Sequence, residues 1–399
     1  MEFISVDGYA MDLNSVNLFV LYKQHLSPVS KGEDVVQIVE DVGGLHATSS
    51  TTPYLSLYAR CSQFEKKDLD LELYDERTLG KVRCVRKTIY IHPKDRIPIV
   101  WKATVGQVIT ESKGFMTGRG VTEEMYDKLS KDILQMLRGR ELAAAEIKAT
   151  LKTDADVSSI LYFMCDQGLL IRARPVKGWR DRRHRYGRFD DYFPDLQLGK
   201  FEESEAISEL VRLYLASFGP ASEVDIAWWT GLGKTKVRKA LRELEDQLVD
   251  VTINEIGEGF FMLQPDKADM EATKLPREPV INLLPYLDPY LMGYKERRRY
   301  LDQVHNNLVF DRSGNVTSVI LVDGKVVGVW DFEEDKEPLV KIFLFQELGT
   351  ALRDKIVAEA ERMGEFIAEA KVKVKECESM VPLTERTAGS MMSPLKDCS

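Results

Sequence analysis

Cysteine is scarce in this chain, and long apolar runs are missing. Its 5 cysteines among 399 residues are scattered and form no Cys-x-x-Cys pair. That spacing argues against a disulfide framework and against a structural zinc site, and it favours a reducing compartment. No apolar run reaches the roughly 18 residues of a transmembrane helix, and the N-terminus lacks the basic and apolar regions of a secretory signal. We therefore expect a cytoplasmic protein with no membrane partner.

The sequence motifs of common cofactors and nucleophiles are also missing. Neither an HExxH nor a Gly-x-Ser-x-Gly pattern is present. The run GLGKT at residues 231–235 imitates the end of a phosphate-binding loop. Such a loop needs a further glycine five residues before Gly233, and this chain has Trp228 there. We expect no cofactor, no metal ion and no bound nucleotide.

Positive charge is not in excess over the whole chain, but it is concentrated in one segment. The formal net charge is −9, from 55 Lys and Arg against 64 Asp and Glu, so contact with a polyanion must use local basic patches. Residues 172–188 form such a patch, with seven arginines against the single acid Asp181. The pattern favours binding to phosphates with release of counterions. The alternative is a solvated loop, or salt bridges to Asp190-Asp191 and Glu202-Glu203. The candidate DNA-binding residues here are Arg172, Arg174, Arg180, Arg182, Arg183 and Arg185.

Residues 211–242 have the pattern of a helix-turn-helix. An apolar helix is followed by Ser222, a favourable N-cap for a second helix over 223–230, and Gly231 and Gly233 supply the turn into a third. That third helix opens with cations, and this motif places a basic helix N-terminus in the major groove of DNA. The candidate DNA-binding residues are Lys234, Lys236 and Arg238.

The same pattern recurs twice, so we predict three tandem winged-helix domains. Helices are expected over 125–137, 141–150 and 156–167 in the second copy, and over 13–26, 33–42 and 53–61 in the first. A wing of two strands joined by a glycine turn is expected after residue 248 in the third copy, and a strand over 79–91 in the first. The predicted domain bounds are 1–118, 119–198 and 199–275.

From residue 276 onward, apolar and polar residues alternate, which predicts β-strands. Turns are expected at Ser313-Gly314-Asn315 and at Asp323-Gly324. We predict a small antiparallel β-barrel or sheet, then a C-terminal helix and a flexible tail. The predicted bounds of these three parts are 276–342, 343–377 and 378–399. The fold class is α+β.

Three stretches of the chain are similar to a known family. They are FGPASEVDIAWWTGL at 218–232, LLPYLDPYLMGYKERRRYL at 283–301 and ILVDGKVVGVW at 320–330. These resemble the tandem winged-helix DNA glycosylases (AlkZ-like), and the resemblance spans roughly residues 10–375. It implies a C-shaped molecule with a basic concave surface and double-stranded DNA as partner. It also implies hydrolysis of the N-glycosidic bond of alkylated purines, and in some members the unhooking of interstrand crosslinks.

The resemblance locates a candidate catalytic pair, and there this chain departs from the family. Members carry Gln-x-Gln or Gln-x-Asp where this chain has His46-Ala47-Thr48. An N7-alkylated purine is a cationic leaving group, so a placed water and stabilisation of the oxocarbenium ion suffice. A neutral His46 would accept a proton from that water and Thr48 would hold it, so activity should rise with pH through about 6.5. Alternatively, the pair only closes the turn after Gly43-Gly44, or senses the base without cleaving it.

Other candidates have weaker patterns. Arg86 and Thr88 are expected beside the His46 turn, although a solvent-facing strand would have the same alternation. Asp288 is expected to form a buried ion pair with one of Arg297, Arg298 and Arg299, and Trp228-Trp229 is expected in the core. The 311–318 turn is expected to probe DNA at the lesion. Its candidate DNA-binding residues are Arg312 and Asn315.

Two functions are consistent with these patterns. The first is a monofunctional DNA glycosylase that acts on alkylated or crosslinked purines. The second is a non-catalytic winged-helix DNA-binding protein, a transcriptional regulator or damage sensor on the same scaffold. Because no dimer interface or ligand domain is evident in the pattern, we favour the glycosylase, and we expect a monomer associated with the nucleoid.

Overall fold

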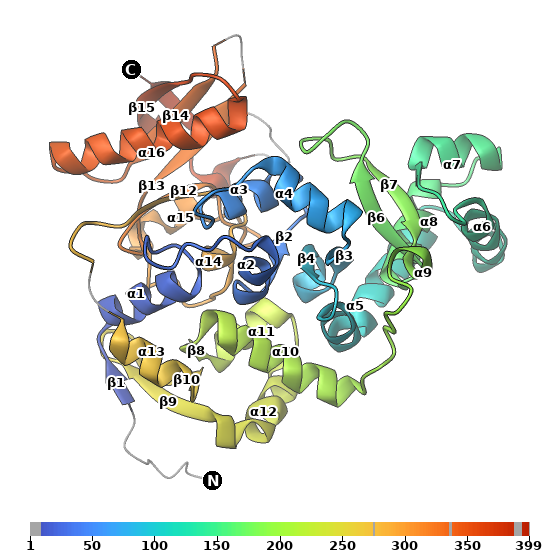
Figure 1. Ribbon diagram of the computed structural model, residues 1–399, viewed down its shortest axis with the longest axis horizontal. Coiled ribbons are helices and arrows are strands. Elements are labelled where there is room, and N and C mark those ends of the chain that lie inside the picture. The colour runs from blue at the N-terminus through green and yellow to red at the C-terminus, as the bar shows by residue number, and fades with distance from the viewer. Residues whose placement is uncertain (1–8, 274–275, 335–336, 387–392, 399) are drawn as a thin grey trace.

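The computed structural model describes residues 9–273, 276–334, 337–386 and 393–398. The fold is α+β, as predicted. Figure 1 shows the first helical unit in the centre, the second at the right, the third at the lower left, and a C-terminal sheet with its helix at the upper left. None of the helices within the described ranges is long and apolar enough to cross a membrane.

The first unit contains the three predicted helices and a sheet that was only partly predicted. The helices are α1 (Leu13–Lys23), α2 (Val35–Asp41) and α3 (Thr52–Tyr58). Strand β2 (Leu45–His46) follows α2 and pairs with β4 (Ile89–Pro93), which also pairs with β3 (Leu79–Arg83). The unit ends in α5 (Ile97–Gly118), a long helix that we did not predict.

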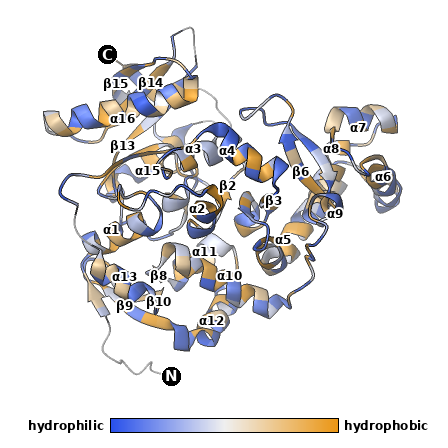
Figure 2. Ribbon diagram, in the orientation of Figure 1, coloured by the Kyte–Doolittle hydropathy of each residue, from blue (hydrophilic) through white to orange (hydrophobic). Residues whose placement is uncertain are grey.

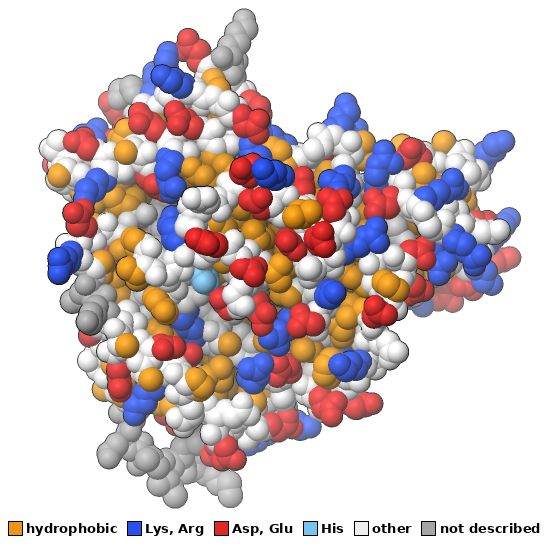
Figure 3. All heavy atoms as spheres, viewed as in Figure 1, with side chains coloured by type: hydrophobic (Ala, Val, Ile, Leu, Met, Phe, Trp, Pro, Cys, Tyr) orange, Lys and Arg blue, Asp and Glu red, His pale blue; other side chains and the backbone are white. Residues whose placement is uncertain are grey.

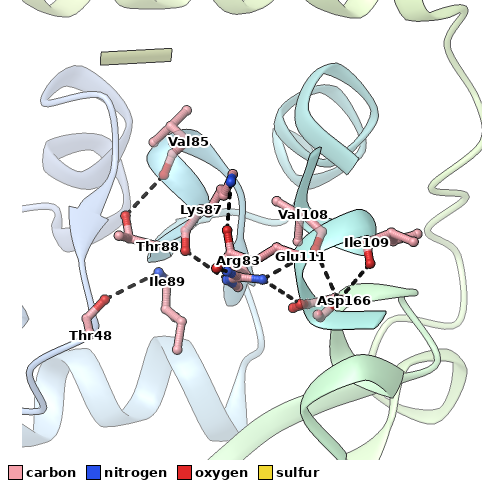
Figure 4. A network of polar contacts seen from close by, with 11 residues as sticks. Thr48, Arg83, Val85, Lys87, Thr88, Ile89, Val108, Ile109, Glu111 and Asp166 are labelled. Carbon is pink, nitrogen blue, oxygen red and sulfur yellow. Dashed lines mark hydrogen bonds and ion pairs between the residues drawn. The ribbon is translucent and has the colours of Figure 1, made fainter. Parts of the chain in front are cut away.

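The single strand expected over residues 79–91 is wrong, because the chain reverses there as a hairpin. The turn is held by Arg86 and Lys87, whose φ angles are +50° and +57°. Residues other than glycine rarely adopt positive φ, and neither glycine nor asparagine marks this turn in the sequence. The Arg83 guanidinium braces it by donating to the Lys87 carbonyl (2.8 Å) and pairing with Asp166 (2.8 Å) and Glu111 (2.6 Å) (Figure 4).

The second and third units each combine three helices with an antiparallel ribbon, to whose edge a short strand adds, β5 (Leu142–Ala143) in the second and β8 (Ala221–Ser222) in the third. The second comprises α6 (Glu123–Met136), α7 (Ala144–Leu151), α8 (Val157–Asp166), β6 (Leu170–Pro175) and β7 (His184–Arg188). The third comprises α10 (Glu203–Phe218), α11 (Glu223–Thr230), α12 (Lys234–Glu243), β9 (Leu248–Ile253) and β10 (Gly257–Leu263). Ser222 caps α11 as predicted, its hydroxyl accepting from the Asp225 amide at 3.2 Å, and Gly231 ends α11 at φ +72°. Strand β1 (Tyr9–Met11) returns from the start of the chain to pair with β9 in parallel.

The C-terminal part is an open sheet of six strands. In spatial order they are β11 (Ile281–Leu284), β12 (Val319–Val322), β13 (Lys325–Glu333), β14 (Leu339–Leu344), β15 (Lys373–Met380) and β16 (Leu395–Cys398). The predicted turn at Asp323-Gly324 joins β12 to β13. The strands from β11 to β14 are antiparallel, as expected for residues 276–342, whereas β15, beyond those bounds, pairs with β14 in parallel. The connection between them is α16 (Thr350–Ala368), which carries both hydrophobic and hydrophilic segments (Figure 2).

The predicted C-terminal helix over 343–377 is wrong at both ends. It begins after Gly349 and ends at Glu369, which takes a left-handed conformation. Its buried residues, Ile356, Ala360, Met363 and Ile367, recur at helical spacing. The next segment, KVKVKECES, alternates with period two and forms β15. The strand was missed because its alternating lysines and glutamates also suit an exposed helix face.

The predicted flexible tail is also wrong where the structure describes it. Strand β16 pairs antiparallel with β15, and Cys377 and Cys398 lie directly opposite each other. They form a disulfide, which the cysteine spacing had argued against. The two residues are 21 positions apart in sequence, and only strand pairing brings them together. Residues 387–392 and 399 of the expected tail lie outside the described ranges.

A buried ion pair joins the first unit to the C-terminal sheet. Arg60, just after α3, donates from both terminal nitrogens to the Asp288 carboxylate at 2.8 and 2.7 Å, and both side chains are 0% exposed. The expected pairing of Asp288 with one of the arginines at 297–299 is therefore wrong. Arg299 instead donates to the Pro220 carbonyl, and Arg298 pairs with Glu296.

Replacing Arg60 by Met should destabilise the protein strongly. The variant leaves the Asp288 carboxylate buried without its cation, a loss that typically costs about 3–5 kcal/mol. Chemical denaturation would measure the free energy of unfolding. Arg298→Met is the matched control, because its pair with Glu296 is exposed and should contribute less than about 1 kcal/mol. Equal losses in the two variants would show that the Arg60 pair does not hold the units together.

Candidate active site and nucleic-acid interface

His46 is buried in the sheet of the first unit. It pairs across β2 and β4 with Tyr90, their ring centroids are 5.1 Å apart, and the histidine is 3% exposed. Burial, and then the charge of Arg86, lowers the pKa of His46 to about 3. The imidazole is therefore neutral throughout the physiological range. A pKa of about 3 gives no reason to expect activity to rise through pH 6.5 by titration of His46.

One hydrogen bond of His46 favours a particular tautomer. Its Nδ1 lies 3.4 Å from the backbone N–H of Thr48, which donates to it. A neutral imidazole that accepts at Nδ1 carries its proton on Nε2. His46 thus presents an N–H donor on its remaining nitrogen, a different role from the proton acceptor that the sequence suggested.

Thr48 lies at the exposed end of the same turn. Its hydroxyl oxygen accepts from the Ile89 amide at 3.4 Å (Figure 4), which leaves the hydroxyl proton available to a ligand. The Thr88 hydroxyl instead donates to the Val85 carbonyl inside the hairpin turn. Thr88 therefore helps to hold the turn.

Arg86 projects from the tip of the β3–β4 hairpin. Its guanidinium lies 4.0 Å from the centroid of the Trp228 ring, and its charge acts on His46. Burial lowers the pKa of this arginine from its ordinary value. The structure thus places Arg86 beside His46, as the sequence suggested. Trp229 is in the core as expected, whereas Trp228 is only half-buried and supports Arg86.

The loop 176–183, between β6 and β7, packs against the turn that follows His46. The Ser50 hydroxyl donates to the Arg180 carbonyl at 3.0 Å. Trp179 anchors the loop, with its ring 5.3 Å from that of Tyr54 and the Lys66 ammonium 4.6 Å from its centroid. Figure 1 shows this loop reaching from the second unit toward α3.

The arginines of the basic segment have different environments. Arg172 is buried at 6% exposure, so DNA cannot reach it in this conformation. Arg182 is exposed and has no hydrogen-bond or ion-pair partner among the described residues. The other four form ion pairs: Arg174 with Asp75, Arg180 with Glu334, Arg183 with Asp181, and Arg185 with Glu146. Of the arginines in the segment, Arg188 alone pairs with Asp190 and Asp191, which was the alternative to phosphate binding.

Tyr286 is a site residue that sequence reasoning missed. Its carbonyl accepts from the Thr52 hydroxyl at 2.8 Å, and the residue is 41% exposed. Burial and the Asp311 carboxylate raise the pKa of its phenol, and Arg182 opposes them. Tyr286 is therefore within electrostatic reach of both the basic loop and the 311–315 turn. The sequence contained it in the motif LLPYLDPY, but nothing there separated it from core aromatics.

The 311–315 turn is compact and lies outside the six-stranded sheet. A single bridge joins Phe310 to Val316, and the Asp311 carboxylate accepts from the amides of residues 313 and 315 at 2.8 Å. The Asn315 side chain also donates to Asp311, so it holds the turn. Arg312 is exposed at the tip.

The lysines and arginines of α12 lie apart from the residues around His46. Lys236 pairs with Glu203 and Arg238 with Glu223, at 2.6 and 2.7 Å, while Lys234 is exposed. Figure 1 shows α12 at the lower edge of the molecule and β2 near its centre. On the face seen in Figure 3, acidic and basic side chains alternate, and the outline is hollowed between the C-terminal sheet and the second unit.

Comparison with known proteins identifies the family. Residues 39–366 match the family described as DNA glycosylase AlkZ-like. An interstrand DNA cross-link repair glycosylase of Streptomyces sahachiroi is 24% identical over 345 residues, which span 81% of this chain and 88% of that protein. The structure of Streptomyces sahachiroi DNA glycosylase AlkZ shares the fold, with a TM-score of 0.73 at 21% identity over 92% of this chain and 100% of that one. Because the family match spans most of its length, this protein belongs to the AlkZ-like DNA glycosylase family.

Proposed function

We propose that this DNA glycosylase hydrolyses the N-glycosidic bond of alkylated purines in duplex DNA, including purines in interstrand crosslinks. The observation that carries the proposal is the neutral His46 beside Thr48 and Arg86, where the basic loop 176–183 packs on the same turn. The relative from Streptomyces sahachiroi, named for crosslink repair, supports the substrate class. That the protein acts as a monomer stays a prediction.

The chemistry asks for placement of water and for little acid–base strength. An N7-alkylated purine leaves as a neutral base, so its departure needs no protonation. The Nε2–H of His46 would donate to the attacking water and the Thr48 hydroxyl would orient the same water, which passes a proton to solvent after it adds to C1′ of the cationic sugar. An imidazole N–H at this position replaces the amide N–H of the family's glutamine, which explains how a histidine serves in its place.

We further propose that the three helical units are winged helices and that DNA lies against the hollow between the second unit and the C-terminal sheet. Arg86, Arg182 and Arg312 would meet phosphates directly, because no described carboxylate forms an ion pair with them. Arg174, Arg183 and Arg185 would exchange their exposed carboxylates for phosphates. Arg172 is left out, because it is buried. Lys234, Lys236 and Arg238 would contact a more distant part of the duplex.

One observation favours the non-catalytic alternative. His46 is 3% exposed, so a base can reach it only if the turn opens or a nucleotide is extruded toward it. A damage sensor would need neither movement. An excision assay separates the two functions, because only the glycosylase produces abasic sites.

His46→Ala should lower excision by about 10²–10⁴-fold, the usual contribution of a water-positioning group, while DNA affinity is retained. Excision is measured on duplexes that carry 7-methylguanine, as strand breaks after mild alkali. His46→Gln should retain activity because it keeps an N–H donor. The wild-type rate should stay level between pH 5.5 and 8, since the pKa of His46 is about 3.

His305→Ala is the control, since that ring stacks on Phe345 away from the turn. A wild-type protein that excises nothing from alkylated or crosslinked duplexes would establish the DNA-binding alternative. A rate that rises through pH 6.5 and loses that rise in His46→Gln would contradict the proposed neutral donor.

Arg182→Gln should flatten the dependence of log K on log salt by about 0.9, because the variant no longer neutralises one phosphate. The matched control is Arg183→Gln, the next residue, whose guanidinium is already paired with Asp181 at 2.8 Å. It should change the slope less, because DNA must compete with that carboxylate. Binding isotherms on undamaged duplex at several salt concentrations measure both. A larger change in Arg183→Gln would refute the assignment.

A further inference from the structure

Two half-buried arginines flank the 311–315 turn. Arg86 stacks on Trp228, and Arg297 lies 3.5 Å from the centroid of the Phe310 ring. A methyl group built on Gly314 would sit 3.1 Å from Nη2 of Arg297 and 3.9 Å from Trp228. The two guanidinium groups are therefore held close to each other, by aromatic rings and by a turn that approaches them tightly.

The protein gives neither cation a direct ion-pair partner. Among the described residues, no carboxylate lies within ion-pair distance of Arg86 or Arg297. The charge of Arg86 adds to burial in lowering the pKa of Arg297. The Asp311 carboxylate acts on both arginines and opposes this effect, although its oxygens accept hydrogen bonds from the amides of its own turn and from neither guanidinium.

Arg297 also has unused hydrogen-bonding capacity. Its Nη1 donates to the Asn306 side chain at 3.0 Å, whereas its Nε is buried without an acceptor. Leaving a charged donor buried and unpaired is costly. The neighbouring Arg298, by contrast, donates from Nε and Nη2 to Glu296, at 2.9 and 2.6 Å.

We propose that Arg86 and Arg297 together bind one phosphodiester group of the DNA strand that carries the lesion. A phosphate supplies acceptors for two guanidinium forks at once and neutralises their mutual repulsion. The proposal rests on the proposed function, and it extends that function to Arg297, which no motif had assigned to DNA.

Electrostatics at the neighbouring turn support the same assignment. Arg86 is close enough to act on His46, so its charge also acts where the cationic sugar would form. The two guanidinium charges, which Asp311 offsets only in part, would oppose bond cleavage. A bound phosphate removes one further unit of positive charge from this group, and the opposition weakens. Binding of the phosphate by Arg86 and Arg297 thus holds the DNA strand in place and reduces the electrostatic opposition of these two charges to bond cleavage.

The test is a methylphosphonate scan, in which one backbone phosphate at a time loses its charge. The duplex carries a stable abasic analogue, so that binding is measured without any excision. Wild-type affinity should fall roughly 10- to 100-fold at one position near the analogue, the loss expected for a charged hydrogen-bonded contact. Arg86→Gln and Arg297→Gln should each bind the unmodified duplex more weakly and show a smaller further loss at that position, because only one guanidinium remains to lose its contact.

Arg298→Gln is the matched control, and it should keep the full sensitivity at that position. Arg297→Lys should retain most of the salt dependence if charge is the main requirement, and thermal unfolding confirms that each variant is folded. The proposal would be overturned if, at every position scanned, the loss of affinity from the arginine substitution and the loss from the methylphosphonate were simply additive. If the position-specific loss persists in a protein that excises no base, the phosphate site stands and the proposed glycosylase function fails.

Discussion

The ion pair between Arg60 and Asp288 positions two segments of the candidate site, the turn that carries His46 and the segment that carries Tyr286. Every oxygen of the Asp288 carboxylate is used, since it also accepts from the Ser56 hydroxyl and the Tyr290 amide. The turn that carries His46 lies just before α3, which leads to Arg60, and Tyr286 lies two positions before Asp288. Because the pair is fully buried, neither segment can shift without leaving the charge of Arg60 or Asp288 unpaired in the interior.

A second buried pair has the same effect on the other side. Arg83 ties the β3–β4 hairpin to α5 and α8 through Glu111 and Asp166. The position of Arg86 at the hairpin tip is thereby fixed relative to the second unit. Placement of catalytic groups within fractions of an ångström depends on such supporting contacts, and here they connect segments that are distant in sequence.

The parts predicted correctly from sequence are those that local chemistry determines. The third unit was found because Ser222 and Gly231 mark a cap and a turn that are read within a few residues. His46 and Thr48 were found because they are neighbours in the chain. Arg86 was expected beside them, and its charge reaches His46, although its hairpin turn has no glycine to reveal it.

What could not be predicted depends on pairing between distant segments. The partner of Asp288 is 228 positions away, and β15 is a strand because it lies parallel to β14. The carboxylates that pair with Arg174, Arg180 and Arg185 come from three different parts of the chain. Charge density alone therefore overstated how many arginines are available, and only the structure singles out Arg182.

The parallel pairing of β1 with β9 has a consequence for how the protein is made. Residues 9–11 complete a sheet whose other members begin at residue 221. A ribosome that adds about 5–20 residues per second therefore exposes the first unit for on the order of ten seconds before its partners emerge. During that time its apolar surface is open to chaperones. Residues 9–11 are thus synthesised well before the strand with which they pair, and they are among the last to take their place in the fold.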